Sequence, residues 1–161
     1  MTEYNTKFKT TTPDLARKLL ITSSFIIVDV IFAFKMEHCM DFALFDLLCV
    51  ISSFNYWSDP NYGWKRNLDM IISVPLYFYH ILCAQNELTD YPTERFIYLL
   101  SATSCGVMYG IGAVSSNPKC GQQCHSFMHI VGVIANMFMY YYLSKARAQY
   151  QFSKFDVYDI D

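Results

Sequence analysis

Apolar residues along the chain form long runs that charged and turn residues interrupt. Each run has about 17–25 residues, the length that an α-helix needs to cross the hydrocarbon core of a bilayer. The runs are apolar on all sides, whereas a helix of a small soluble bundle needs one polar face. The pattern predicts an all-α polytopic membrane helix bundle with about five transmembrane helices. The predicted spans are residues 17–36, 40–57, 68–84, 94–116 and 125–143.

Polar segments flank this bundle at both ends. The chain divides into a polar N-terminal tail at 1–16, a transmembrane bundle at 17–143 and a polar C-terminal tail at 144–161. Thr12 can cap the first helix ahead of Pro13, a residue that suits the first helical position. Pro75 inside the third span predicts a kink.

Composition supports a membrane location. Hydrophobic residues make up 53% of the chain and charged residues 16%, against roughly 25% charged in an average soluble domain. A net charge of −2 gives no reason to expect nucleic acid as a partner. Because the chain is predicted to lie in a membrane, we expect membrane lipid as its partner. We expect no cleavable targeting segment, because the polar start is unlike the short basic head of a signal peptide. A soluble protein with buried helices is the alternative, since several runs are near the lower length limit.

Basic residues are unevenly shared between the two sides of the predicted bundle. One side carries Lys7, Lys9, Arg17, Lys18, Lys65, Arg66 and Lys119. The other side carries Lys35 and Arg95 among a larger number of acidic residues. This bias predicts a multi-pass integral membrane protein with a cytosolic N-terminus, because basic loops stay in the cytosol. Lys145, Arg147 and Lys154 oppose this orientation, since five spans place them on the outer side.

Polar residues from three predicted spans are expected at one face of the membrane. Loops separated by an even number of spans lie on the same face, so the end of the second span and the starts of the third and fifth share one depth. The residues at that depth are Ser52, Ser53, Tyr56, Trp57, Asp69, His125 and His129. His80 lies about 16 Å beyond Asp69 along the third span, so we expect it at the opposite face. The convergence predicts a site at the first face.

The segment CGQQCHSFMHIVG at residues 120–132 places two cysteines and two histidines at i and i+4. Residues with that spacing lie on one helix face, so His125 and His129 can reach one metal ion. Interfacial histidines without a metal are the alternative. Cys120 and Cys124 can ligate a metal, pair as a disulfide or lie free in a loop. We favour free thiols or ligands, because the basic side is expected to be the reducing cytosol.

Two carboxylates are predicted inside the membrane. Asp29 lies near the middle of the first span and Asp46 within the second. An ionisable group at such a depth is costly and usually faces the bundle interior with a partner. We expect Asp29 to be protonated, bonded to a hydroxyl such as that of Ser73 or Thr103, or hydrated in a cavity. Asp69 lies nearer the interface, where a helix-start carboxylate needs no special role.

Three elements of this pattern resemble the CREST superfamily of membrane hydrolases, which includes the alkaline ceramidases and the adiponectin-type receptors. SFNYW at residues 53–57 resembles the family's Ser-x-x-x-His motif, and NLDMIIS supplies Asp69 at the start of the next span. HSFMHIVG resembles the HxxxH motif of the family's final span. The resemblance implies a site where three histidines hold zinc, while an Asp and a Ser position the water that attacks an amide or ester.

The chain departs from this family in two ways. Trp57 stands where the third histidine is expected, and a tryptophan cannot ligate a metal. The family usually has more spans, and the interval from Asp69 to His125 is too short to hold the extra pair. The candidates for a ligand beside His125 and His129 are Asp69, Cys124 and Cys120. The alternative is a scaffold that persists without the metal site.

The first function that we expect is a metal-dependent hydrolase of a lipid amide or ester, with its site at one membrane face. Zinc would lower the pKa of water and polarise the scissile carbonyl. His125 and His129 would hold the zinc. Asp69 would be a ligand or the general base, and Ser53 would stabilise the oxyanion.

The second function is that of a non-enzymatic polytopic scaffold or interaction protein, whose tyrosine-rich segments form interfacial belts. The third, which we favour least, is that of a channel or transporter that uses Asp29 and Asp46. Gly106 and Gly110 form one GxxxG pattern, which lets helices approach closely and predicts helix–helix partners there. Whether the protein is an enzyme is left open by the residues alone.

Overall fold

The computed structural model describes residues 11–61 and 63–155, which form α-helices joined by short connections. The helices are α1 (Pro13–Ser23), α2 (Ile26–Lys35), α3 (Met40–Ser58), α4 (Trp64–Glu87), α5 (Pro92–Val114) and α6 (Pro118–Phe155). The all-α prediction is therefore confirmed for the described chain. Residues 1–10 of the predicted N-terminal tail, with Lys7 and Lys9, and residues 156–161 of the C-terminal tail lie outside the described residues.

Three helices are long and apolar enough to cross a membrane: α4, α5 and the Pro118–Gln151 part of α6. They have 24, 23 and 34 residues, more than the roughly 20 that a spanning helix needs. Large apolar side chains such as Ile71, Phe96 and Ile134 are exposed on them, as expected for surfaces that face lipid. The structure thus indicates a membrane protein. The full count of five spans and the cytosolic N-terminus stay predictions.

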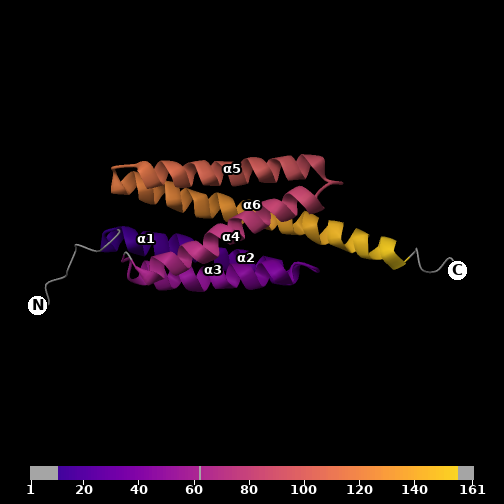
Figure 1. Ribbon diagram of the computed structural model, residues 1–161, viewed down its shortest axis with the longest axis horizontal. Helices are drawn as coiled ribbons and strands as arrows, with labels where there is room; N and C mark the ends of the chain where they lie inside the picture. The colour runs from indigo at the N-terminus through magenta and orange to yellow at the C-terminus, as the bar shows by residue number, and fades with distance from the viewer. Residues whose placement is uncertain (1–10, 62, 156–161) are drawn as a thin grey trace, which may run out of the picture.

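The first predicted span is divided into α1 and α2, which Ser24 and Phe25 join. The hydroxyls of Thr22 and Ser24 donate to the backbone carbonyls of Leu19 and Ile21, at 3.1 and 2.5 Å. The backbone N–H of Phe25 bonds to the carbonyl of Thr22, as in a 3₁₀ turn. Hydroxyl bonds of this kind compete with the regular helical pattern at the break. α1 and α2 follow one another over the length of the first predicted span (Figure 1).

The helices form two groups, which are linked by α4 and by the contacts of α6 with α1 and α2. α5 and α6 lie side by side and antiparallel, while α1, α2 and α3 form the other group (Figure 1). α4 begins beside α3 and crosses to the start of α5, and it continues through Pro75 (Figure 1). The larger buried cluster includes Phe42 of α3, Ala84 of α4 and Met139 of α6. α6 has 38 residues, and its C-terminal part extends past the other helices (Figure 1).

Two glycines allow α5 and α6 to approach closely. A Cβ atom added at Gly112 would lie 3.3 Å from the backbone oxygen of Gly121 and 3.2 Å from the Cβ of Cys124. A Cβ added at Gly121 would lie 3.2 Å from the oxygen of Gly112. At Gly110 an added Cβ would meet no described atom within 4 Å, whereas at Gly106 it would lie 3.0 Å from the Tyr77 hydroxyl. The close contact within the chain therefore uses a different glycine pair from the predicted GxxxG, whose role toward other chains stays a prediction.

A cavity lined by carboxylates and imidazoles

One face of α6 carries a row of polar side chains, the α6 seam, which consists of His125, His129, Asn136, Tyr140 and Arg147. Successive members are four or seven residues apart, so they lie on one side of the helix. Four of them hydrogen-bond to other helices, and His125 packs against Trp57 of α3. The seam therefore connects the polar groups of the bundle from one end of α6 to its C-terminal half.

A cavity of about 250 Å³ lies among α2, α3, α4, α5 and α6. Most of its wall is apolar, but carboxylates and imidazoles also line it. These are Asp29, Asp46, Asp69, His80, His125 and His129. Val74, Gly106 and Tyr109 line the cavity too and are exposed, so it reaches the surface between α4 and α5. The predicted site residues Ser53, Asp69, His125 and His129 thus all line the same cavity.

Asp69, early in α4, is held by two hydroxyls from the last turns of α3. Ser53 donates to Asp69 Oδ1 at 2.7 Å, and Ser52 lies 3.0 Å from the same oxygen. All three side chains are buried. Two donors on one carboxylate oxygen stabilise its charge and fix its orientation. Because the Ser53 proton is committed to Asp69, Ser53 in this arrangement positions the carboxylate.

The two histidines at the start of α6 lie against each other, with ring centroids 4.8 Å apart. His129 Nε2 lies 3.3 Å from the hydroxyl of Ser23, just before the break between α1 and α2. The Trp57 ring meets the His125 ring edge-on, with centroids 5.3 Å apart. Trp57 thus occupies the position beside the imidazoles at which the resemblance expects a third histidine.

The cysteines of the CGQQC segment are not in a loop, because α6 begins at Pro118 and includes them. Both are free thiols, and Cys124 is buried. Cys124 faces Gly112 of α5 and is absent from the wall of the cavity. Among residues 11–61 and 63–155, no group of three or more His, Cys, Asp or Glu side chains could hold a metal ion. We therefore assign no chemical step to zinc, and zinc binding by His125 and His129 stays a prediction.

Asp29 lies at the inner end of the cavity and is only 1% exposed. Its Oδ2 atom accepts a hydrogen bond from the Asn136 side-chain amide at 3.1 Å, and its Oδ1 atom has no partner among the described residues. The hydroxyls that we expected as partners bond elsewhere: Ser73 to the Cys49 thiol and Thr103 to the carbonyl of Leu99. Sequence reasoning did not find Asn136, although it lies seven residues after His129 on the same helix face.

A second buried group links Asp46 of α3, His80 of α4 and Tyr140 of α6. The Tyr140 hydroxyl lies 2.6 Å from both His80 Nε2 and Asp46 Oδ2. His80 Nδ1 lies 2.8 Å from the carbonyl oxygen of Leu76, which can only accept, so Nδ1 carries a proton. Two hydrogen bonds at the Tyr140 hydroxyl need two protons, and Tyr140 supplies one. The second is on Asp46 or on His80, and the group is neutral as a whole in either case.

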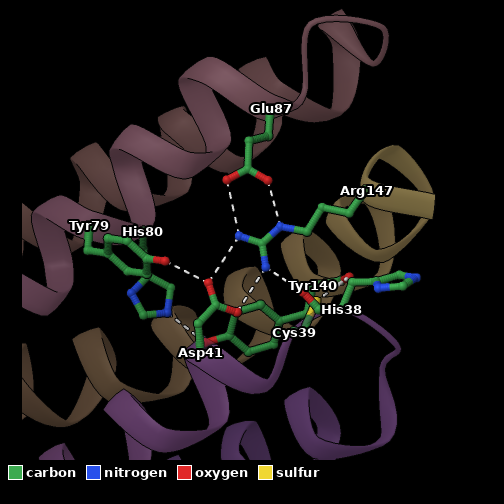
Figure 2. Close-up of polar contacts among 8 residues, drawn as sticks. All are labelled: His38, Cys39, Asp41, Tyr79, His80, Glu87, Tyr140 and Arg147. Atoms are coloured by element: carbon green, nitrogen blue, oxygen red, sulfur yellow. Dashed lines mark hydrogen bonds and ion pairs between the residues drawn. The ribbon is translucent and has the colours of Figure 1, made fainter. Parts of the chain in front are cut away.

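An ion-pair cluster of Arg147, Asp41 and Glu87 joins three helices at the end of α4 (Figure 2). The Arg147 guanidinium donates to both oxygens of Asp41 at 2.8 and 3.0 Å, and to both oxygens of Glu87 at 3.1 and 2.6 Å. Tyr79 also donates to Asp41, at 2.6 Å. Arg147 reaches the backbone oxygen of His38 as well. The cluster joins the start of α3, the end of α4 and the C-terminal half of α6.

Cys39, in the connection before α3, adds a contact to this end of the bundle. Burial raises the pKa of its thiol to about 11, so the thiol keeps its proton at neutral pH. The thiol donates to the backbone oxygen of Tyr140 at a distance of 3.6 Å. Cys39 therefore acts as a weak structural donor between the start of α3 and α6.

Comparison of the chain with protein-family models, with curated protein sequences and with solved structures finds no match.

Proposed function

We propose that the chain crosses the membrane five times and hydrolyses an amide or ester bond of a lipid. α3 has 19 residues and is about 28 Å long, close to the hydrocarbon thickness of roughly 30 Å. α1 and α2 follow one another and together supply another span. Exposed apolar side chains on these helices, such as Ile31, Phe34 and Ile51, support a lipid-facing surface.

The presence of Ser53, Asp69, His125 and His129 in the lining of one cavity supports the hydrolase proposal. These residues come from α3, α4 and α6, so local sequence does not explain why they share a cavity. The cavity has a mainly apolar wall and reaches the surface between α4 and α5, as a site for an acyl chain requires. A carboxylate beside two hydroxyls, with imidazoles in the same cavity, is suited to general acid–base chemistry.

Asp69 is the general base in this proposal. It takes a proton from water as the water oxygen bonds to the scissile carbonyl carbon, and the carbonyl electron pair moves to oxygen. A neutral imidazole of His125 or His129 has one N–H group, which can hydrogen-bond to that oxygen. Asp69 then returns the proton to the leaving nitrogen or oxygen as its bond to carbon breaks. Ser53 keeps Asp69 in position throughout.

Hydrolysis by the purified full chain in phosphatidylcholine nanodiscs tests this function. The probes are 4-nitrophenyl dodecanoate, an ester, and N-dodecanoyl-4-nitroaniline, an amide. We expect the wild type to release nitrophenol or nitroaniline faster than empty nanodiscs. A His125→Ala/His129→Ala variant should lose about 10²–10³-fold in rate, as expected when hydrogen bonds to a developing oxyanion are removed. A wild-type rate equal to that of empty nanodiscs would contradict the proposal.

A lipid-binding scaffold without catalytic activity is the second candidate, and Trp57 favours it. In that case the cavity binds lipid without reacting with it. The Trp57 indole lies beside His125, where a third histidine would be needed to complete a zinc site. Replacing Trp57 by histidine is expected to raise bound zinc from near zero to about one ion per chain, because three histidines form a regular zinc site. Elemental analysis of the purified protein measures this change.

Trp64→His is the matched control, because Trp64 is 66% exposed and lies outside the cavity wall. Zinc uptake by both variants would show that an added histidine binds metal wherever it is placed. About one zinc in the wild type, lost in the His125→Ala/His129→Ala variant, would instead show that the natural side chains complete a metal site. Such a result would assign the hydrolysis to a metal.

A further inference from the structure

The inner end of the cavity has a hydrogen-bonding position that the described chain leaves unfilled. Asp29 is 1% exposed, and its Oδ1 atom has no partner among the described residues. An unpaired polar atom in a buried site costs about 1–3 kcal/mol, and an unpaired charge costs more. Asp29 also lines the cavity, so a ligand there can reach it.

Neither protonation state of Asp29 satisfies this position. An ionised Oδ1 needs a donor or a cation, and a protonated Oδ1 needs an acceptor. Asn136 is already engaged with Oδ2. The neighbouring Asp46, His80 and Tyr140 share their protons with one another, so they leave Asp29 without a partner. The partner of Oδ1 must therefore come from outside the described chain.

The charges around the cavity favour a cation. Besides Asp46, whose group with His80 and Tyr140 is neutral, its lining includes Asp29 and Asp69, and no lysine or arginine of the described chain lines it. Asp69 accepts hydrogen bonds from two serine hydroxyls, whereas Asp29 accepts only one, from the Asn136 amide. Asp29 is therefore the carboxylate that still needs a partner. A bare Ca²⁺ or Mg²⁺ ion does not suit the position, because these ions require about six oxygen ligands. The wall beside Asp29 is largely apolar and includes Ile26 and Val133.

The geometry points to an amine-binding site at Asp29, which takes the protonated amino group of an amphiphilic molecule. The ammonium donates to Asp29 Oδ1, and the apolar chain of the ligand fills the cavity toward the opening between α4 and α5. Asn136 is about 10 Å further along α6 than His129, so the amine lies about two helical turns from His129. The proposal concerns binding alone, and it stands whether or not hydrolysis occurs.

Binding of dodecylamine to the full chain in phosphatidylcholine nanodiscs tests this inference. Equilibrium dialysis with radiolabelled ligand measures it, and empty nanodiscs correct for partition into lipid. We expect saturable binding of about one dodecylamine per wild-type chain, and binding weaker by about tenfold or more in Asp29→Asn, because an amide cannot match the charge of an ionised partner. Dodecanol, which has the same chain without the charge, should not compete.

Asp90→Asn is the matched control, since Asp90 is an exposed aspartate outside the cavity and should bind like the wild type. Equal binding by Asp29→Asn and the wild type would overturn the proposal, as would the absence of saturable binding. The latter result would leave water as the partner of Oδ1. If Asp29→Asn fails to fold, as judged by circular dichroism, the wild type decides: equal competition by dodecanol would overturn the proposal, and no competition would support it. Loss of hydrolysis with intact amine binding would affect only the hydrolase proposal.

Discussion

Asn in place of Asp69 is expected to lower the hydrolysis of 4-nitrophenyl dodecanoate by about 10²–10⁴-fold, the usual contribution of a positioned general base. An amide at this position cannot accept a proton from water. It has nearly the shape of the carboxylate and can still accept hydrogen bonds from Ser52 and Ser53, so the packing between α3 and α4 should persist. Rates in nanodiscs at saturating ester give the loss in kcat.

Ser53→Ala provides the companion measurement. Ser53 orients Asp69 without contacting the water in the proposed step, so its loss should lower kcat less than the loss of Asp69. Because a carboxylate that loses a donor binds its proton more tightly, the lower limb of the pH–rate profile of Ser53→Ala should move to higher pH. An Asp69→Asn rate equal to the wild-type rate would exclude Asp69 as the base. An unchanged pH profile in Ser53→Ala would exclude the positioning role.

Methionine in place of Arg147 is expected to lower the free energy of unfolding by about 2–3 kcal/mol, because it leaves Asp41 and Glu87 facing each other without a cation. The Arg147, Asp41 and Glu87 side chains are 21%, 30% and 33% exposed, so water offsets part of the loss expected for a fully buried pair. Methionine keeps most of the apolar contact with Phe42, over whose ring the guanidinium lies at 5.1 Å. Unfolding in mixed micelles, followed by circular dichroism, measures the change.

Lys18→Met is the control for this prediction. Lys18 pairs with Asp14 at 3.0 Å on α1, but the two side chains are 54% and 75% exposed. Breaking an exposed i, i+4 pair should cost less than about 0.5 kcal/mol. Adding Glu87→Gln to Arg147→Met should recover part of the stability, since it removes one of the two repelling charges. Equal losses in Arg147→Met and Lys18→Met would show that the cluster does not stabilise the bundle.

The depth of polar residues could be predicted from the sequence, whereas their direction around each helix could not. Counting spans placed Ser53, Asp69, His125 and His129 at one level, and in the structure all four line one cavity. The same counting gave His80 the opposite level but did not pair it with Asp46. Asp46 lies near the start of α3 and His80 near the end of α4, so their depths match. Counting spans could therefore have predicted that His80 and Asp46 lie close together.

The scaffold interpretation gave the tyrosine-rich MYYYL segment of α6 to interfacial belts and helix contacts without distinguishing its members. In the structure Tyr140 is a helix contact, because it is fully buried between His80 and Asp46. The interval from Asn136 to Arg147 through Tyr140 has the spacing of one helix face, a signal that the sequence contains. The break after Ser23 and the continuation of α6 to Phe155 depend on hydroxyl bonds and tertiary contacts, which apolar run length does not encode.

The length of α6 gives the molecule a fixed spacer. Its 38 residues extend about 57 Å, while a bilayer with its headgroups is about 40–45 Å thick. A helix that enters at one headgroup surface therefore stands about 12–17 Å clear of the other. Arg147 anchors this projecting part to α3 and α4 near its base, so it is held at a set angle. Any molecule that binds near Tyr150 would be kept at a defined height above the membrane, in a defined orientation to the bundle.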